Sequence, residues 1–194
     1  MVHITDSPAH PYAWVDALDA YCLSRWRGLD IDAALEALTG PPHSVLDADY
    51  AEAMQASYTA PGSPQPVQRA SLGGHDVCLV PNGWLINVYG PTLTANGGEI
   101  LSVFWNVNGT MNMSLARNGE QVRSFEPYLR DEGVGSPLEW EALVDWTEEP
   151  APYWNRTQKR SLPHLFALAC GQDFDEDWLV HTTRPTRILI APPG

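Results

Sequence analysis

Five residues in the middle of the chain carry the side chains best suited to recognising a polar ligand. They are asparagines and aromatic residues that share one face of a predicted sheet: Asn87, Tyr89, Phe104, Asn106 and Asn112. An amide donates and accepts hydrogen bonds, and an aromatic ring offers a flat apolar surface. The set is suited to a sugar, a peptide or another flat polar ligand. The alternative is that helices cover this face and that the amides satisfy backbone groups.

A second candidate surface is an aromatic pair, Tyr153 and Trp154, in a loop that also contains Pro150 and Pro152. Large aromatic side chains dominate the energetics of many protein interfaces. The pair therefore indicates either an exposed contact for a partner protein or an anchor of the loop on the protein's own core.

An acidic run near the C-terminus resembles a calcium-binding loop in its spacing. It consists of Asp173, Asp175, Glu176 and Asp177. A calcium loop requires glycine at its sixth position and a bidentate glutamate at its twelfth. This chain has Trp178 and an arginine there, so the run favours capping of a short helix over a cation site.

No motif for catalysis stands out. The six histidines are scattered, with no pair at metal-ligand spacing, and no phosphate-binding glycine loop or nucleophile elbow occurs. Glu99 and Glu126 both border the predicted sheet and are candidates for an acid–base pair, with surface carboxylates as the alternative. The sequence predicts no catalytic residue, no metal and no cofactor, and an enzyme is the less favoured class.

The charge of the chain is strongly acidic and unevenly spread. The net charge is −13, and only 18% of the 194 residues are charged. Residues 1–57 hold nine acids and two arginines, residues 58–125 hold three of each, and residues 126–194 hold twelve acids and six basic residues. A neutral sheet with acidic flanks disfavours nucleic acid and anionic membranes and would attract a basic protein. Improved solubility is the alternative role of the acids.

The three cysteines argue against both a disulfide framework and a zinc site. Cys22, Cys78 and Cys170 are odd in number, far apart and set among apolar residues, which is typical of buried free thiols. The N-terminal residues show no signal peptide, and no apolar run is long enough to cross a bilayer. We therefore expect a cytoplasmic protein without a membrane partner, and the oligomeric state stays open.

The N-terminal part reads as helical. Apolar residues at helical spacing predict a helix over residues 14–26, Asp30 caps a second helix through Leu38, and a third begins at Asp47 and runs to Ser57. Residues 1–58 are thus predicted to be a helical segment packed on the sheet. The Pro/Gly/Ser-rich residues 59–70 predict a linker.

Residues 71–194 are predicted to hold an antiparallel meander of four to six strands followed by helices, in one α+β unit overall. The predicted strands cover residues 77–80, 84–89 and 100–107. At Asn108-Gly109, a three-residue turn that pairs Val107 with Met111 gives one apolar stripe, whereas a two-residue turn mixes apolar with polar residues.

The second hairpin has a two-residue turn at Asn118-Gly119, which places Arg117 opposite Glu120 and Leu115 opposite Val122. Beyond it, the patterns predict three more helices and a last strand. The helices cover 137–146, 161–170 and a short segment capped by residues 173–177, and an edge strand covers 188–190.

A family resemblance rests on the residues of the meander. The Gly-Trp strand at 83–86, the Val-Phe-Trp-Asn-Val-Asn strand within 100–108 and the hairpin at 118–127 resemble a family of uncharacterised actinobacterial proteins. Residues 14–22 and 162–179 fit the same pattern. The resemblance implies the fold, and because the family has no established activity, it implies no function.

These observations leave two functional hypotheses. The first is a non-enzymatic, acidic domain that binds a basic protein, as an inhibitor or immunity-type partner of an effector. The second is a small-molecule or carbohydrate binder, or an enzyme, that uses the Asn/Tyr face of the sheet.

Overall fold

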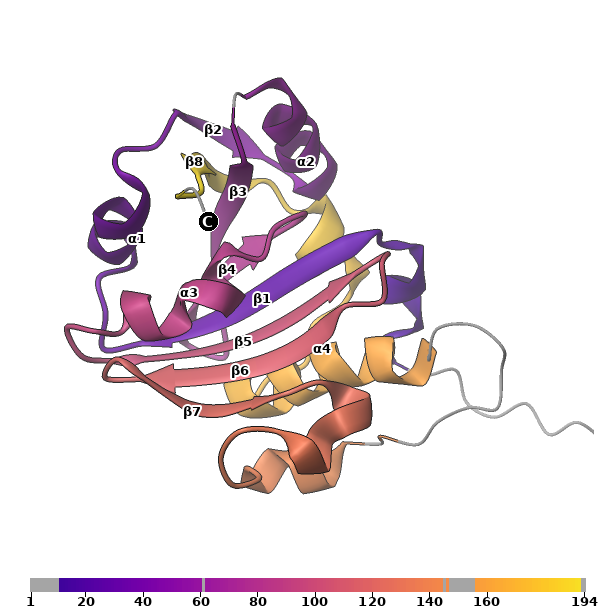
Figure 1. The fold of residues 1–194 in the computed structure, drawn as a ribbon. Coiled ribbons are helices and arrows are strands. Elements are labelled where there is room, and N and C mark those ends of the chain that lie inside the picture. Colours follow the sequence, from indigo (N-terminus) through magenta and orange to yellow (C-terminus); the bar gives the residue numbers. More distant parts are fainter. Residues whose placement is uncertain (1–10, 61, 145, 147–155, 193–194) are drawn as a thin grey trace, which may run out of the picture.

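A computed structural model describes residues 11–60, 62–144, 146 and 156–192. One antiparallel sheet of eight strands runs through the molecule, in the order β2-β8-β3-β4-β1-β5-β6-β7. Helices pack against both faces of this sheet, as Figure 1 shows. The predicted α+β class is confirmed, with eight strands where the sequence predicted four to six.

The sheet is built from strands of five to nine residues. They are β1 (Ala20–Arg27), β2 (Ser44–Ala48), β3 (Pro64–Leu72), β4 (His75–Val80), β5 (Glu99–Asn106), β6 (Met111–Arg117), β7 (Glu120–Phe125) and β8 (Arg184–Ile190).

The α-helices are α1 (Ile31–Thr39), α2 (Tyr50–Thr59), α3 (Leu85–Leu93) and α4 (Arg156–Cys170). Three short 3₁₀ helices are η1 (Ala13–Ala17), η2 (Pro127–Glu132) and η3 (Glu139–Leu143), and η4 (Asp177–His181) is a π-type turn. Among the described residues, no helix has both the length and the apolar character needed to cross a membrane.

Each face of the sheet has its own core. On the first face, Leu23, Val103 and Met113 pack with Leu165 and Phe166 of α4. On the second face, apolar strand residues pack against α1 and α3. They are Cys22, Trp26, Cys78, Ile100 and Phe104, which meet Ile31, Leu35, Leu85 and Ile86.

The helix predicted over residues 14–26 is wrong, because most of this segment is the central strand β1. Tyr21 and Leu23 belong to the core of the first face, and Cys22 and Trp26 to that of the second. A strand that is buried on both faces shows no apolar–polar alternation. Its apolar residues therefore also satisfy a helical spacing.

The linker predicted at residues 59–70 is also wrong, because β3 occupies most of it. Pro64 and Pro66 pair with β8, and β4 pairs only with residues 68–72. The prolines thus lie where β3 has one partner strand, and there a missing backbone N–H is tolerated. Residues 1–58 are likewise more than a helical segment, since they supply β1 and β2 to the sheet.

Residues 84–89, predicted as a strand, begin helix α3 instead. The side-chain oxygen of Gln65 accepts hydrogen bonds from the backbone N–H groups of Trp84 and Leu85, at 3.0 and 3.4 Å. This cap comes from β3, about twenty residues away in the sequence. A six-residue alternation therefore could not reveal the helix start.

The meander is confirmed, with corrections to its register. β5 pairs with β6 so that Trp105 lies opposite Met111 and Val103 opposite Met113, a shift of two residues that keeps the predicted apolar stripe. The two-residue Asn118-Gly119 turn is confirmed, with both residues at positive φ. A bulge beyond it pairs Leu115 with Arg123 rather than Val122.

The C-terminal elements differ from the predictions in extent. Helix α4 begins at Arg156 and keeps Pro163 in its interior. Because proline has no N–H, the carbonyl of Lys159 accepts from the hydroxyl of Tyr21 instead, at 2.6 Å. The helix predicted at 137–146 is only the short η3. Strand β8 lies between β2 and β3 and is not an edge strand.

Candidate functional site

The five residues of the predicted Asn/Tyr face do not share one open surface. Asn87 and Tyr89 lie on α3, and the amide of Asn87 donates to the hydroxyl of Ser102 at 2.9 Å. Phe104 is buried in the second core. The side chain of Asn106 accepts from two backbone N–H groups of the β5–β6 turn, and Asn112 donates to Ser124 at 3.2 Å.

Part of that face is a seam between α3 and a row of serines. Ser24, Ser102, Ser114 and Ser124 lie directly opposite one another on β1, β5, β6 and β7. A Cβ atom added to Gly90 of α3 would lie 3.1 Å from the Cβ of Ala116 on β6. Small residues on the helix and the sheet therefore let α3 lie close to the strands, which leaves little room for a ligand between them.

The other predicted sites are not brought together. Tyr153 and Trp154 lie outside the described residues. Glu99 begins β5 beside the end of β6, whereas Glu126 follows β7, which runs six residues away from that end. At about 3.3 Å per residue, the two carboxylates are separated by roughly 20 Å and cannot act as an acid–base pair.

The acidic run instead borders a cavity of about 400 Å³ that we call the 172–178 pocket. Its walls are acidic, amide and aromatic side chains: Gln172, Asp173, Phe174, Asp175 and Trp178. The carboxylates of Asp173 and Asp175 are exposed, as are the neighbouring Glu176 and Asp177.

Local sequence explains why the chain forms this pocket. Gly171 ends α4 with a φ of 67°, a left-handed conformation that glycine adopts readily. The side chain of Gln172 then accepts from the N–H of Gly73 at 2.8 Å, which ties the loop to the β3–β4 turn. Asp175 accepts from the N–H of Trp178 at 2.9 Å, so the predicted capping role of the acidic run is confirmed for this residue.

An aromatic cluster supports the pocket from within. The ring of Phe174 lies 5.1 Å from that of Trp178 and 5.3 Å from that of Tyr12. The Tyr12 hydroxyl donates to Asp173 at 2.9 Å, and burial followed by this carboxylate raises the pKa of Tyr12. Tyr12 therefore stays neutral and fixes the orientation of the Asp173 carboxylate.

This arrangement suits a cationic group. Carboxylates attract a guanidinium or an ammonium ion, and the face of an indole ring adds a cation–π contact. Trp178 already makes one such contact inside the protein, since the Arg184 guanidinium lies 4.9 Å from its ring centre. The exposed acids around a half-buried tryptophan are therefore equipped to hold a lysine or arginine side chain of a partner.

The sequence reasoning missed a second surface at η2 and η3. A cavity of about 260 Å³ is lined by residues 127–132 and Trp146, and nearby apolar side chains are exposed. They are Tyr128, Leu129, Val134 and Leu143. The sequence signal for this surface was the presence of large apolar residues in the segment after β7, which shows no helical or strand periodicity.

Within the described residues, no three histidine, cysteine, aspartate or glutamate side chains are placed to hold a metal ion. Comparisons with protein-family models, with curated proteins and with solved structures found no match to this chain. The resemblance to the actinobacterial family therefore stays a prediction.

Proposed function

We propose that this protein is a non-enzymatic, acidic recognition domain that binds a basic partner protein through the 172–178 pocket. The observation that carries the proposal is the set of exposed carboxylates around Phe174 and Trp178. An inhibitor or immunity-type role toward a basic effector is the form of this function that the charge favours, since oppositely charged surfaces steer association.

The rigidity of the pocket also supports a binding role. Its acidic side chains are held by hydrogen bonds from Tyr12 and from the backbone of Trp178. A surface that is already ordered loses less conformational entropy when a partner binds.

The proposed compartment is the cytoplasm. Cys22, Cys78 and Cys170 are buried free thiols. Unpaired cysteines are typical of proteins in reducing compartments, where disulfides are rare.

Capture of partners with matched variants tests the proposal. In one variant, D173N/D175N/E176Q, three charges are removed but side-chain oxygens that can accept hydrogen bonds are kept. In the control, D131N/E132Q/E139Q, the same charge is removed from exposed positions of η2 and η3. We expect wild type and control to retain a basic protein at low salt and the first variant to lose it. Equal capture by all three proteins contradicts the proposal.

A further inference from the structure

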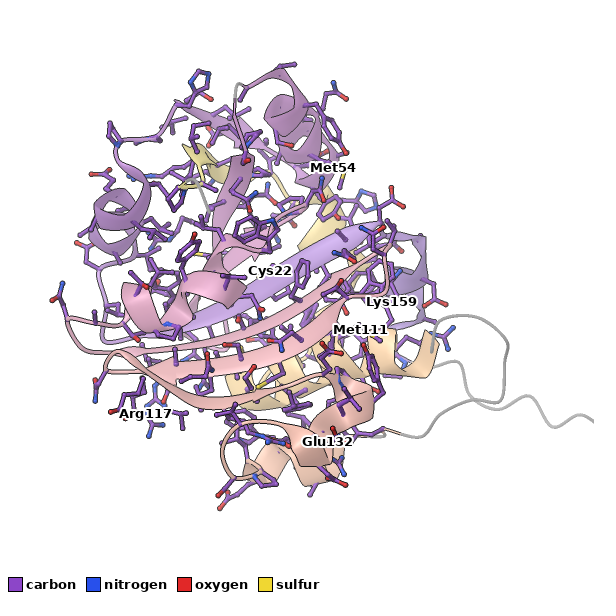
Figure 2. All side chains as sticks on the ribbon, in the orientation of Figure 1. Cys22, Met54, Met111, Arg117, Glu132 and Lys159 are labelled. Carbon is purple, nitrogen blue, oxygen red and sulfur yellow. The ribbon has the colours of Figure 1, made fainter. Side chains whose placement is uncertain are left out.

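Three arginines surround one glutamate at the end of the sheet where β1 and β6 finish and β5 begins. Glu99 lies directly opposite Arg27 on β1 and Arg117 on β6. One carboxylate oxygen lies 2.9 Å from Arg25 and 3.6 Å from Arg27, and the other accepts from Nε of Arg117 at 2.9 Å. Figure 2 shows Arg117 at this end of the sheet and Met111 toward the opposite end.

Two of these four charged side chains are buried and two are exposed. The side chains of Arg25 and Glu99 are 6% and 10% exposed, whereas those of Arg27 and Arg117 are 59% and 52% exposed. One carboxylate can offset only one guanidinium. The cluster therefore carries two excess positive charges on a protein whose net charge is −13.

The two exposed arginines retain donors for a ligand. Arg117 uses Nε and Nη2 on Glu99, and within the described part of the chain its Nη1 has no hydrogen-bond acceptor. Among the described residues, Glu99 is the one carboxylate within 4 Å of Arg27. A guanidinium presents five N–H donors in a planar fork that matches phosphate and carboxylate oxygens.

A surface cavity of about 450 Å³ adjoins these arginines. It is lined by Arg27, Gly28, Gly98, Glu99, Arg117 and Asn118.

Two of the residues that line this cavity are glycines whose backbone segments lie close together. A Cβ atom at Gly98, whose φ is 82°, would lie 2.7 Å from the carbonyl oxygen of Arg27. Gly28 has a φ of 67°, and its added Cβ would lie 3.7 Å from the Cα of Gly98. Both positions therefore favour glycine, and the part of the cavity wall that they form is backbone.

From these observations we propose that Arg27 and Arg117 bind the phosphate group of a small anionic ligand in this cavity. A phosphate carries close to two negative charges at neutral pH and matches the local excess of two positive charges better than a carboxylate does. Glu99 positions the guanidinium groups, and Arg25 neutralises it from the buried side. The neighbouring His75 is consistent with a positive environment, because burial and then the charges of Arg25 and Arg27 lower its pKa.

Titration of the ¹⁵N-labelled protein with inorganic phosphate at pH 7.5 and constant ionic strength tests the site. We expect saturable NMR shifts of the backbone amides of Gly28, Gly98 and Asn118. R27Q should weaken the affinity about tenfold, because it removes a charge-assisted hydrogen bond. The control R130Q removes the same charge from η2 and should leave the affinity unchanged.

Each alternative outcome overturns part or all of the proposal. Equal affinities in R27Q and R130Q, with both proteins folded, exclude the site. Acetate shifts that match those of phosphate exclude the preference for phosphate. R27Q is the decisive variant, because Arg27 is exposed and its loss leaves the hydrogen bonds of Glu99 with Arg25 and Arg117 intact. The phosphate titration does not depend on partner binding at the 172–178 pocket. The phosphate site and the proposed function can therefore be disproved independently.

Discussion

Arg123 of β7 and Glu141 of η3 form a buried ion pair in which two guanidinium nitrogens donate to the two carboxylate oxygens, each at 2.9 Å. Their side chains are 2% and 3% exposed. Arg123 also donates to the backbone carbonyls of Arg130, Val134 and Gly135. This pair therefore fastens the segment after β7 to the edge of the sheet.

Loss of this ion pair should strongly destabilise the fold. In E141Q the Arg123 charge stays buried without its carboxylate, and breaking a buried pair costs about 3–5 kcal/mol. Urea denaturation measures the change in the free energy of unfolding. The control E139Q changes an exposed residue of the same turn and should shift it by less than about 0.5 kcal/mol. An equal, small effect of both variants would show that the pair is not a structural anchor.

The side chain of Lys159 should titrate near pH 8. Its ammonium group lies 3.6 Å from the centre of the Trp105 ring and donates to the carbonyls of Asp16 and Leu18. Burial lowers its pKa to about 8, although nearby acids oppose the shift. Because this is the only lysine in the chain, ¹³C-labelled lysine gives one side-chain NMR signal to titrate. A midpoint near 10.5 would contradict the buried placement.

The fold should lose stability as the pH rises above about 9. Burial raises the pKa of Cys22 and of Cys170 from 9.0 to about 12, and also raises that of Cys78. Above pH 9 the unfolded chain releases these protons while the folded chain keeps them, so the equilibrium shifts toward unfolding. Lys159 acts in the opposite sense between about pH 8 and 10.5, and Arg184, whose pKa burial lowers to about 10, does so above about pH 10. Burial also raises the pKa of Tyr12, Tyr21 and Tyr50, so these three groups add to the effect of the three thiols at the upper end of the range.

Urea midpoints measured between pH 7.5 and 10.5 check this pH dependence. C170A should show a shallower decline than wild type, because one of the three thiols is gone. A midpoint that stays level or rises over this range would contradict the burial of the thiols.

Removal of the Gln65 side chain should weaken α3. Q65A leaves the N–H groups of Trp84 and Leu85 without their acceptor, and loss of a helix cap costs about 1 kcal/mol. Q55A, at an exposed position of α2, is the matched control. Hydrogen exchange of the α3 amides should accelerate in Q65A alone, and unchanged protection there would argue against the cap.

Local sequence patterns predicted the elements that depend on nearby residues. The helix after Asp30, the Asn118-Gly119 turn and the end of α4 at Gly171 are examples, because a cap or a positive φ acts within a few residues. Strand β1 and helix α3 were mispredicted. The first is buried on both faces, and the second is capped from β3.

The candidate sites also divide into features set by nearby residues and features set by residues far apart in the sequence. The capping role of Asp175 is local and could be predicted, whereas the 172–178 pocket depends on Tyr12, which lies 161 residues from Asp173. The Asn/Tyr face was predicted by treating residues 84–89 as a strand, whereas they begin helix α3. The arginines around Glu99 come together only through the register of β1, β5 and β6.

A titration with a defined basic probe tests the central proposal most directly. The ¹⁵N-labelled protein is titrated at low salt with a short arginine-rich peptide, and the indole N–H of Trp178 and the backbone amides of 172–178 are followed. We predict saturable shifts there and an affinity about tenfold weaker in D173N/D175N/E176Q, with no change in D131N/E132Q/E139Q. Shifts confined to η2 and η3, or equal affinities in the two variants, would contradict recognition through the 172–178 pocket.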